Sequence, residues 1–290
     1  MLRQTLEQLQ RLEIPAGLEW ELVVVNNNCT DQTDVVLIEF KGKLPLRRVF
    51  EPKPGLSEAR NAAVREARGE RLVWTDDDVL VAPGWLAAYV QAFASHPEAA
   101  FFGGPIEPWF EGEPPAWLLT ALPRISGAYA IRDLGNEAFA FDAERLPYGA
   151  NFSTRRATQL NFPYDPNLGF KAGATVPGEE VACLQAMLAA GHSGWWVPGA
   201  RVRHFLPQNR QNLQYLYKYF FGQGLLLARQ ELAQSGLPSL RERQRAYRKA
   251  FVANTKFHLR RIVGGDPKNW VEELKRAATQ WGRVQGWKKK

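Results

Sequence analysis

Three consecutive aspartates, Asp76, Asp77 and Asp78, directly follow the stretch RLVWT at residues 71–75. The β-branched and aromatic residues of that stretch predict a buried strand, so the carboxylates fall at its carboxyl end. Adjacent carboxylates repel one another, and a positive group is therefore expected nearby. Solvent, a lysine, a calcium ion or a metal ion that carries a substrate could each compensate them. A helix–loop–helix calcium site does not fit, because VLVAPGW at residues 79–85 lacks its glycine and distal glutamate.

A second acidic group, Glu179 and Glu180, opens a predicted helix at residues 177–192. The helix dipole favours acidic side chains at this end whatever their function, so the position is equally typical of a structural role. The same dipole keeps a carboxylate ionised, which a general base requires before it accepts a proton. His204, in the run VRHF, could bind a metal ion or a phosphate, although a lone histidine is more often structural.

The elements that must position these residues alternate along the chain. Runs at residues 20–25, 46–50 and 71–75 predict strands, and helical segments separate them. Such alternation predicts an α/β fold with a mostly parallel sheet that helices cover on both faces. In sheets of this kind, ligands bind beyond the carboxyl ends of the strands. NNNCTD at residues 26–31 and the aspartates at 76–78 both follow strands, so both are expected to face a ligand.

The later part of the chain has a different organisation. Residues 111–150 are irregular and rich in Pro and Gly, which predicts a loop region beside an active site. From about Leu213 onward the pattern predicts helices separated by SGLPS and VGGDP. We therefore expect one domain at 1–212, with halves at 1–105 and 106–212, and a basic helical region at 213–290.

Composition narrows the class of protein. Hydrophobic residues at 45% and charged residues at 23% are typical of a soluble globular protein. Two cysteines do not suggest a disulfide framework, which favours a reducing, cytoplasmic location. No run approaches the roughly 20 apolar residues of a membrane-spanning helix. The opening MLRQTLEQLQ lacks the apolar core of a secretory signal.

The net charge of +7 is unevenly distributed. Residues 201–290 hold 20 Lys and Arg against 5 Asp and Glu, a net charge of +15, which leaves −8 for residues 1–200. Trp270, Trp281 and Trp287 are interleaved with this charge. The pattern is typical of a solvated helical surface, and Trp with Lys and Arg is also typical of contact with anionic lipid. Nucleic-acid binding is the least favoured interpretation, because no nucleic-acid motif accompanies the charge.

Five segments, in order, resemble the motifs of the family 2 glycosyltransferases, which have the GT-A fold, a Rossmann-like sheet flanked by helices. The resemblance runs from Leu2 to about Phe221, and its most specific part ends in the three aspartates. The segments are VVVNNNCTD (23–31), GLSEARNAAVREARGERLVWTDDD (55–78), YGANFSTRR (148–156), GEEVACLQAMLAAG (178–191) and VPGARVRHF (197–205).

This resemblance implies an inverting, metal-dependent, hexosyltransferase-type enzyme. It would move a sugar from a nucleoside-diphosphate sugar to a glycan or lipid-linked acceptor, in polysaccharide or glycolipid synthesis. Mn²⁺ or Mg²⁺ would stabilise the charge that develops on the leaving diphosphate. A base would take the proton of the acceptor hydroxyl, and its attack from the side opposite the leaving group implies inversion.

The resemblance also implies residue roles. Asp78, Asp76 and His204 would hold the metal ion, and Glu180, with Glu179 beside it, would serve as the catalytic base. The nucleotide sugar would be bound by Asn26, Asn28, Asp31, Arg60, Asp76, Asp77 and Asn151.

Two of these residues depart from the family pattern, and two fit a simpler role. Asn26 stands where the family usually has an aspartate that contacts the base, and an amide can still donate and accept at a nucleobase edge. Glu180 also replaces an aspartate, and its longer side chain moves the carboxylate outward by one methylene group. By residue type alone, Arg60 also fits the surface of a helix and Asn151 fits a turn.

The chain begins inside the opening helix of the family pattern. The family normally has a strand before this helix, between the strands at 20–25 and 71–75. We expect that Met1 is an internal start and that this central strand is missing, or that another segment fills its place. A catalytically impaired relative, which binds sugar nucleotide or partners without transfer, is the alternative function. For an active enzyme, the basic region would provide peripheral contact with the inner face of the cell membrane.

Overall fold

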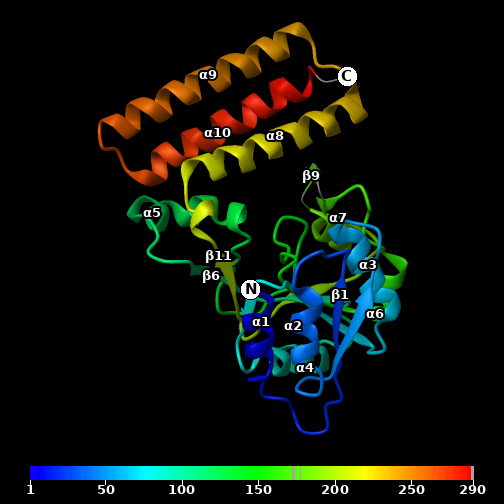
Figure 1. The fold of residues 1–290 in the computed structure, drawn as a ribbon. Coiled ribbons are helices and arrows are strands. Elements are labelled where there is room, and N and C mark those ends of the chain that lie inside the picture. Colours follow the sequence, from blue (N-terminus) through cyan, green and yellow to red (C-terminus); the bar gives the residue numbers. More distant parts are fainter. Residues whose placement is uncertain (172–173, 177, 289–290) are drawn as a thin grey trace. The chain divides into compact units, whose positions relative to one another are not determined.

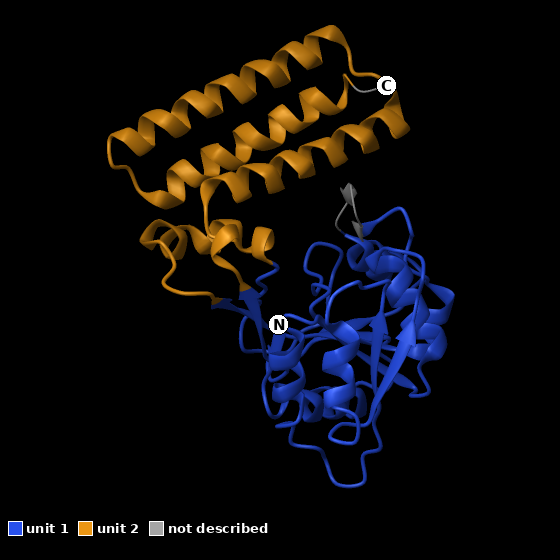
Figure 2. Ribbon diagram, in the orientation of Figure 1, with its two compact units in different colours: residues 1–109, 130–205 blue, residues 110–129, 206–290 orange. Residues whose placement is uncertain are grey.

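The computed structural model describes residues 1–171, 174–176 and 178–288 (Figure 1). The chain forms two compact units (Figure 2). Unit 1 combines Met1–Trp109 with Ala130–Phe205, and unit 2 combines Phe110–Tyr129 with Leu206–Lys290. Unit 1 contains both helices and strands, whereas unit 2 is mainly helical. The candidate site residues named from the sequence all lie in unit 1.

Short strands form several small sheets. They span Leu22–Asn26 (β1), Leu46–Phe50 (β2), Arg71–Thr75 (β3), Val79–Val81 (β4), Phe101–Gly103 (β5), Ile106–Phe110 (β6), Asn151–Arg155 (β7), Gly169–Lys171 (β8), Ala174–Val176 (β9), Gly194–Trp196 (β10) and Val202–Leu206 (β11). One sheet has the order β10-β5-β7-β3 and another the order β4-β11-β6, while β1 pairs with β2 and β8 pairs with β9.

The strand pairing is mixed. β10 runs parallel to β5, as β1 does to β2. β7 runs antiparallel to both β3 and β5, and β11 runs antiparallel to β4. The α/β class is confirmed, but the sheets are mixed and not mostly parallel as expected. In the largest sheet, β7 lies between β3 and β5 and runs in the opposite direction to both. This register sets Asn151 opposite Thr75, next to the three aspartates, and it places β1 and β3 in separate sheets.

Helices of unit 1 pack their apolar faces against these strands. α1 (Leu2–Leu9) buries Leu6 and Leu9 in a core cluster that also contains Tyr89 and Phe102. α3 (Leu56–Glu66) lies beside β1 (Figure 1). The remaining helices of this unit span Thr33–Glu39 (α2), Trp85–Ser95 (α4), Arg156–Asn161 (α6) and Glu179–Ala189 (α7).

Unit 2 is a layer of three long helices with a short helix beside it. Its elements span Ala116–Ile125 (α5), Ser126–Tyr129 (η1), Gln208–Arg210 (η2), Leu213–Ser235 (α8), Leu240–Ile262 (α9) and Pro267–Gly286 (α10). α10 lies between α8 and α9 (Figure 1). A capping box of Ser239 and Glu242 starts α9, and the Asp266 side chain caps α10, in which Pro267 is the first residue. Within the described residues, every helix is too short or too polar to cross a membrane.

Candidate active site

Arg60 lies at the centre of an acidic site. It comes from the buried face of α3 and is only 5% exposed. Its Nη1 donates a hydrogen bond of 2.8 Å to Oε1 of Glu179, and its Nη2 donates one of 3.2 Å to the carbonyl oxygen of Gly149. Because a buried guanidinium must be paired, these contacts tie α3 to the start of α7 and to the loop before β7.

Two further carboxylates approach the same guanidinium. Oδ1 of Asp76 lies 3.6 Å from Nη2 of Arg60, and Oε2 of Glu180 lies 4.0 Å from Nη1. Burial by itself would lower the pKa of Arg60, but the negative charges of Asp76, Glu179 and Glu180 raise it overall. Arg60 is therefore a permanent cation that brings the end of β3 and the first turn of α7 into one site.

Two aromatic rings and a glycine surround the Arg60 guanidinium. The guanidinium carbon lies 5.8 Å from the ring centre of Phe152 and 5.6 Å from that of Tyr164, both within range of cation–π attraction. A Cβ atom at Gly149 would collide with Nη2 of Arg60, so a larger residue there would displace the guanidinium. The Gly149 N–H also donates to Oε1 of Glu180 over 3.2 Å. Sequence reasoning missed Gly149 and Tyr164, although a glycine beside Asn151 in YGAN was a usable signal.

The two glutamates of α7 differ in their environment. Glu179 is 3% exposed, and burial together with the charge of Glu180 raises its pKa to about 7, against the opposing effect of Arg60. The side chain of Glu180 is 14% exposed and contacts Arg60 less closely. Gly178, at a positive φ of 107°, precedes the helix and turns both side chains into the site. Glu179 is thus committed to Arg60, whereas Glu180 retains access to a ligand.

Asp78 pairs with His204 on the neighbouring strand. The β4–β11 register places His204 opposite Val79, the residue after Asp78, and the Phe205 N–H donates to the Asp78 carbonyl over 2.9 Å. Nε2 of His204 lies 3.5 Å from Oδ2 of Asp78. The antiparallel pairing of β4 with β11 therefore brings the His204 imidazole close to the Asp78 carboxylate. The sequence predicted that these two residues, which lie far apart in the chain, would be neighbours.

The aspartate cluster is short of positive charge. Burial and the charge of Asp78 raise the pKa of Asp76, although Arg60 opposes this. Burial and the charge of Asp78 also raise the pKa of Asp77, and Asp31 in the turn after β1 adds to the effect. The effect of Asp31 on Asp77 indicates that the turn after β1 lies within electrostatic range of the aspartates after β3. A cation would relieve the repulsion.

These residues fit a divalent cation that takes part of its coordination from a substrate. Within the part of the chain that the structure describes, no group of three or more His, Cys, Asp and Glu side chains could by itself hold a metal ion. Mg²⁺ and Mn²⁺ are commonly held by one or two carboxylates together with water and substrate phosphates. Asp78 and His204 offer such a partial set, with one carboxylate and one imidazole.

The turn after β1 is held by side-chain amides. Nδ2 of Asn26 donates to Oδ1 of Asp34 over 2.8 Å, and its Oδ1 accepts from the Cys29 N–H over 2.8 Å. Asn28 is exposed in a left-handed conformation with φ of 59°, and Asp31 is exposed and accepts from the Thr33 N–H. Asn28 and Asp31 are therefore accessible, while the Asn26 side chain shapes the turn.

Asn27 was overlooked by sequence reasoning because it sits among three consecutive asparagines. Its Nδ2 donates to the carbonyl oxygens of Glu51 and Lys53, and its Oδ1 accepts from the Gly55 N–H. These bonds join the β1 turn to the loop that leads into α3, and thus fix the helix that carries Arg60.

Asn151 has a fully bonded side chain. Its Oδ1 accepts from Nε1 of Trp85 and from the Tyr89 hydroxyl, each over 2.8 Å. Its Nδ2 donates to the carbonyl oxygens of Pro105 and Ala200 over 2.9 and 2.6 Å. Both lone pairs and both N–H groups are used, so the side chain has nothing left to offer a sugar. The geometry favours the structural role over donor binding.

Solved structures with a similar fold define the class. The chain is similar to mannosyltransferase PcManGT from Pyrobaculum calidifontis in complex with GDP-Man and Mn²⁺, with a TM-score of 0.57, 16% identity and coverage of 100% of this chain and 84% of that one. It is also similar to GalNAc-T7 with UDP, GalNAc and Mn²⁺, with a TM-score of 0.52, 16% identity and coverage of 83% and 50%. At this identity the likeness shows the fold alone, which is the GT-A glycosyltransferase fold.

Sequence comparison finds a similar family and a similar protein. The family model described as glycosyl transferase family 2 matches residues 1–141. The chain is also 25% identical over 227 residues to the succinoglycan biosynthesis protein ExoM of Rhizobium meliloti (strain 1021), across 77% of this chain and 69% of ExoM. The resemblance to family 2 glycosyltransferases that the motifs indicated is therefore confirmed for residues 1–141.

Proposed function

We propose that this glycosyltransferase inverts the anomeric centre of a nucleoside-diphosphate sugar with the help of a divalent cation, Mn²⁺ or Mg²⁺. The observation that carries the proposal is the Arg60 cluster. It brings Asp76, at the end of β3, and Glu179 and Glu180, at the start of α7, to one guanidinium. Glycosyl transfer needs both kinds of acid: one near the leaving diphosphate and one near the attacking hydroxyl.

Glu180 is the proposed base, and Glu179 the proposed partner of Arg60. Glu179 is buried and directly bonded to the guanidinium, so it cannot reach an acceptor without breaking that ion pair. Glu180 is more exposed, and the Gly149 N–H orients its carboxylate. A base needs to be ionised, oriented and accessible. Of the two glutamates, Glu180 meets the last of these conditions better.

The donor side comprises the aspartates and the β1 turn. A bound divalent cation would stabilise the charge that develops on the leaving diphosphate. Asp78 and His204, with Asp76, would hold that cation, and Asp77 would face the nucleotide. Asn28 and Asp31 are accessible in the turn after β1 and would bind the nucleoside. Arg60 would balance the charge of the site between turnovers.

Polysaccharide synthesis is the proposed setting, with a glycan or lipid-linked acceptor. ExoM is a succinoglycan biosynthesis protein, and PcManGT was crystallised with GDP-Man and Mn²⁺. Both cysteines are free, Cys29 exposed and Cys183 buried, which is compatible with a reducing cytoplasm. A cytoplasmic enzyme at the inner face of the cell membrane would meet lipid-linked acceptors there.

The test is the release of nucleoside diphosphate from a panel of UDP- and GDP-sugars, with Mn²⁺, with Mg²⁺ and with a chelator. Release is expected only with a metal ion. Glu180→Gln is expected to lower kcat by about 10²- to 10⁴-fold, because general base catalysis is lost. Asp142→Asn, which changes an exposed carboxylate paired with Arg145, is the matched control and should leave kcat unchanged.

Two outcomes would separate this proposal from its alternative. Donor binding without release in the unsubstituted protein would support a catalytically impaired relative. Release that persists in the chelator and in Glu180→Gln would overturn both the metal dependence and the assignment of the base.

A further inference from the structure

α9 is the edge helix of unit 2. Its buried side carries Ala246, Ala250, Ala253 and Phe257, which recur at the spacing of one helical face. This side packs on α10, which separates α9 from α8 (Figure 1). Among the described residues of unit 2, no helix therefore lies against the opposite side of α9.

This outer side carries a line of exposed apolar residues. Leu240, Phe251 and Ile262 are spaced eleven residues apart, close to three helical turns, and so lie on one line along the helix. Ile262 is 80% exposed and the adjoining Val263 is 78% exposed, the highest values for large hydrophobic side chains in the described chain. Such residues cost solubility unless they have a partner.

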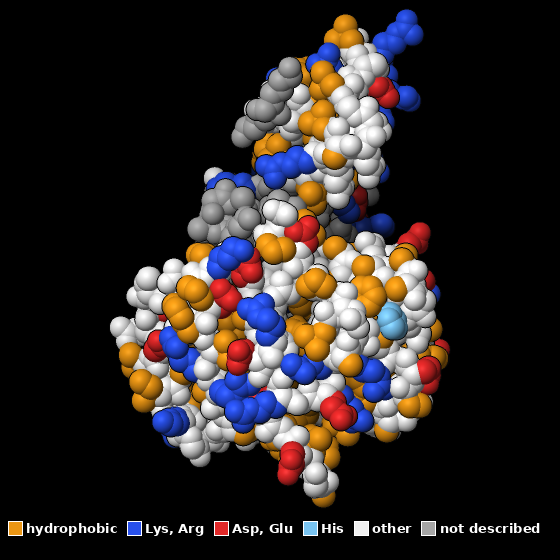
Figure 3. Space-filling view, turned by 90° about the vertical axis from the view of Figure 1, so that its right-hand side faces the viewer, with side chains coloured by type: hydrophobic (Ala, Val, Ile, Leu, Met, Phe, Trp, Pro, Cys, Tyr) orange, Lys and Arg blue, Asp and Glu red, His pale blue; other side chains and the backbone are white. Residues whose placement is uncertain are grey.

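Positive charge surrounds the apolar line. α9 holds eight Lys and Arg residues against a single acidic residue, Glu242. Figure 3 shows Lys and Arg side chains next to hydrophobic ones on this helical unit. The exposed basic residues of α9 are Arg241, Arg245, Arg248, Lys249, Lys256, Arg260 and Arg261.

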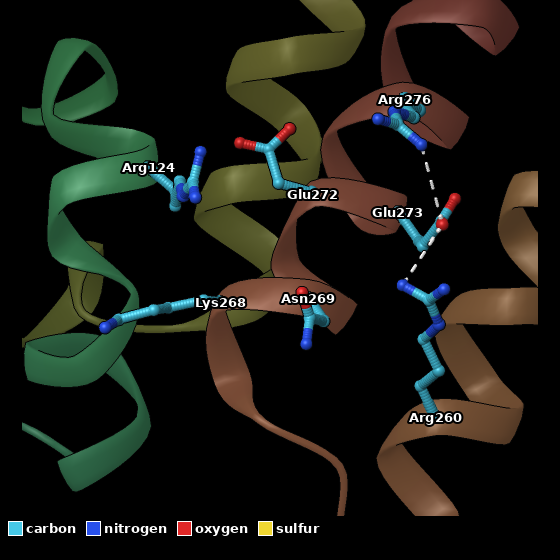
Figure 4. A pocket seen from close by; sticks show the side chains of 7 residues that line it. All are labelled: Arg124, Arg260, Lys268, Asn269, Glu272, Glu273 and Arg276. Atoms are coloured by element: carbon cyan, nitrogen blue, oxygen red, sulfur yellow. Dashed lines mark ion pairs between the residues drawn. The ribbon is translucent and has the colours of Figure 1, made fainter.

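A basic pocket adjoins the end of α9. It has a volume of about 280 Å³, and α5, α9 and α10 each contribute to its lining (Figure 4). Glu273 is buried and pairs with Arg260 at 3.3 Å and Arg276 at 3.6 Å. Arg124 and Lys268 add two further cations and Glu272 one further anion, so four cations face two carboxylates and the pocket keeps an excess of positive charge. The α9 residue of this pocket, Arg260, pairs with α10, so the pocket adds positive charge to the unit but does not belong to the outer side of α9.

The tryptophans that suggested lipid contact in the sequence do not supply it. Trp270 and Trp287 are buried, and Trp281 packs edge-on against Tyr247 at 5.0 Å between ring centres. They face inward because α10 is the central helix of the layer and its large side chains fill the contacts on both sides. If this region contacts lipid, residues other than these tryptophans must make the contact.

We propose that the outer side of α9, with the corner at Ile262 and Val263, binds the surface of a membrane that contains anionic phospholipids. The apolar line would enter the boundary of the acyl chains, and the exposed basic residues of α9 would contact lipid phosphates. A second copy of the chain is a poorer partner, because it would present the same positive charge. A nucleic acid would leave the apolar line in water. This surface is independent of the proposed sugar transfer.

The test is co-sedimentation of the full chain with vesicles of phosphatidylcholine containing about one third phosphatidylglycerol, and with phosphatidylcholine alone. Binding is expected with the anionic vesicles and should weaken as salt rises. The double variant Ile262→Ser, Val263→Ser should bind about tenfold less tightly, because two inserted apolar side chains are lost. The double variant Arg248→Glu, Lys256→Glu should bind the anionic vesicles more weakly, by about fivefold or more for each residue replaced.

Ile38→Ser is the matched control, because Ile38 is 71% exposed on α2 of unit 1 and should not contact the vesicle. Thermal unfolding should be unchanged in all variants, since each replaced side chain is exposed. Equal binding by the unsubstituted chain and both double variants would overturn the proposal. Self-association that the Ile262→Ser, Val263→Ser variant abolishes, without vesicle binding, would also overturn it. Tight DNA binding without vesicle binding would do the same.

Discussion

Arg60 is a buried cation whose partners come from separate parts of the chain. Glu179 begins α7, Asp76 follows β3, and Gly149 precedes β7. Removing one member of such a group leaves the others buried without a partner, which is costlier than the pair itself is stabilising. The stability of unit 1 and the chemistry of its site therefore depend on one side chain.

We expect Arg60→Met to lower the free energy of unfolding by about 3–5 kcal/mol, because buried carboxylates lose their cation. Arg65→Met on the same helix is the control. Arg65 pairs with Glu51 at the surface, so its replacement should lower the free energy of unfolding by only about 0–1 kcal/mol. Urea unfolding of the two variants makes the comparison. A loss at Arg60 no larger than at Arg65 would show that the guanidinium is dispensable.

Glu179 makes stability depend on pH in a defined direction. Its pKa is raised from the ordinary value of 4.5 to about 7 in the folded protein. Between these values the folded state binds a proton that the unfolded state does not, so this group's contribution to the free energy of unfolding falls as pH rises.

Glu179→Gln mimics the protonated side chain and should remove this dependence. The free energy of unfolding of the variant, compared with that of the unsubstituted protein, should rise by about 1–3 kcal/mol as pH increases from 5 to 7.5. Urea midpoints at the two pH values measure the gain, and Glu66→Gln, an exposed position on α3, serves as the control. A constant difference across this range would contradict the raised pKa.

Close contact between α8 and α10 depends on glycine. A Cβ atom at Gly224 would collide with the Thr279 carbonyl, and one at Gly282 would collide with the Phe221 carbonyl. The two helices approach each other with backbone against backbone at this point. Large residues elsewhere on α10, such as Trp270, fill the wider gaps on either side.

Gly224→Ala should therefore destabilise the protein by about 1–3 kcal/mol through overpacking. Gly222→Ala, two residues earlier on α8, is a matched control, because its Cβ would meet nothing within 4 Å. At Gly222 the change to alanine should raise the free energy of unfolding by about 0.5–1 kcal/mol, since glycine is a poor helix former. Thermal or urea unfolding distinguishes the opposite signs. Equal effects at the two positions would mean that the helices can move apart freely.

Across the whole molecule, charge is divided between the two units. The acidic groups of the site gather in unit 1, whereas unit 2 holds 19 Lys and Arg against 7 Asp and Glu, a net charge of +12, which leaves −5 for unit 1. The acidic site attracts cations, and the basic helices attract anions. A metal ion and a nucleoside diphosphate should therefore act together on unit 1, because each neutralises the charge that opposes the other.

A nucleoside diphosphate with Mn²⁺ should raise the melting temperature, by an amount equivalent to about 2.7 kcal/mol at a ligand concentration one hundred times Kd. Either component alone should raise it less. Asp78→Ala should abolish the joint increment, since Asp78 is a proposed ligand of the cation. Differential scanning fluorimetry with a chelator control measures this. An increment that survives both the chelator and Asp78→Ala would show that the diphosphate binds without metal.

The sequence alone determined the class of fold and the order of its motifs. Alternation of strands and helices predicted the α/β class, and five ordered motifs indicated the glycosyltransferase family. It also predicted that Asp78 and His204 would share a site. These properties are readable because periodicity, turn residues and motif order are local in the chain.

Only the tertiary structure decided what each polar residue contacts. Arg60 and Asn151 were both expected at the donor, yet Arg60 binds the acids of α7 and Asn151 bonds to Trp85, Tyr89 and two backbone carbonyls. The tryptophans of α10 turned inward, and Ile262 and Val263 became the exposed apolar pair. Burial and hydrogen bonding depend on neighbours that lie far away in sequence, and side-chain type by itself does not record them.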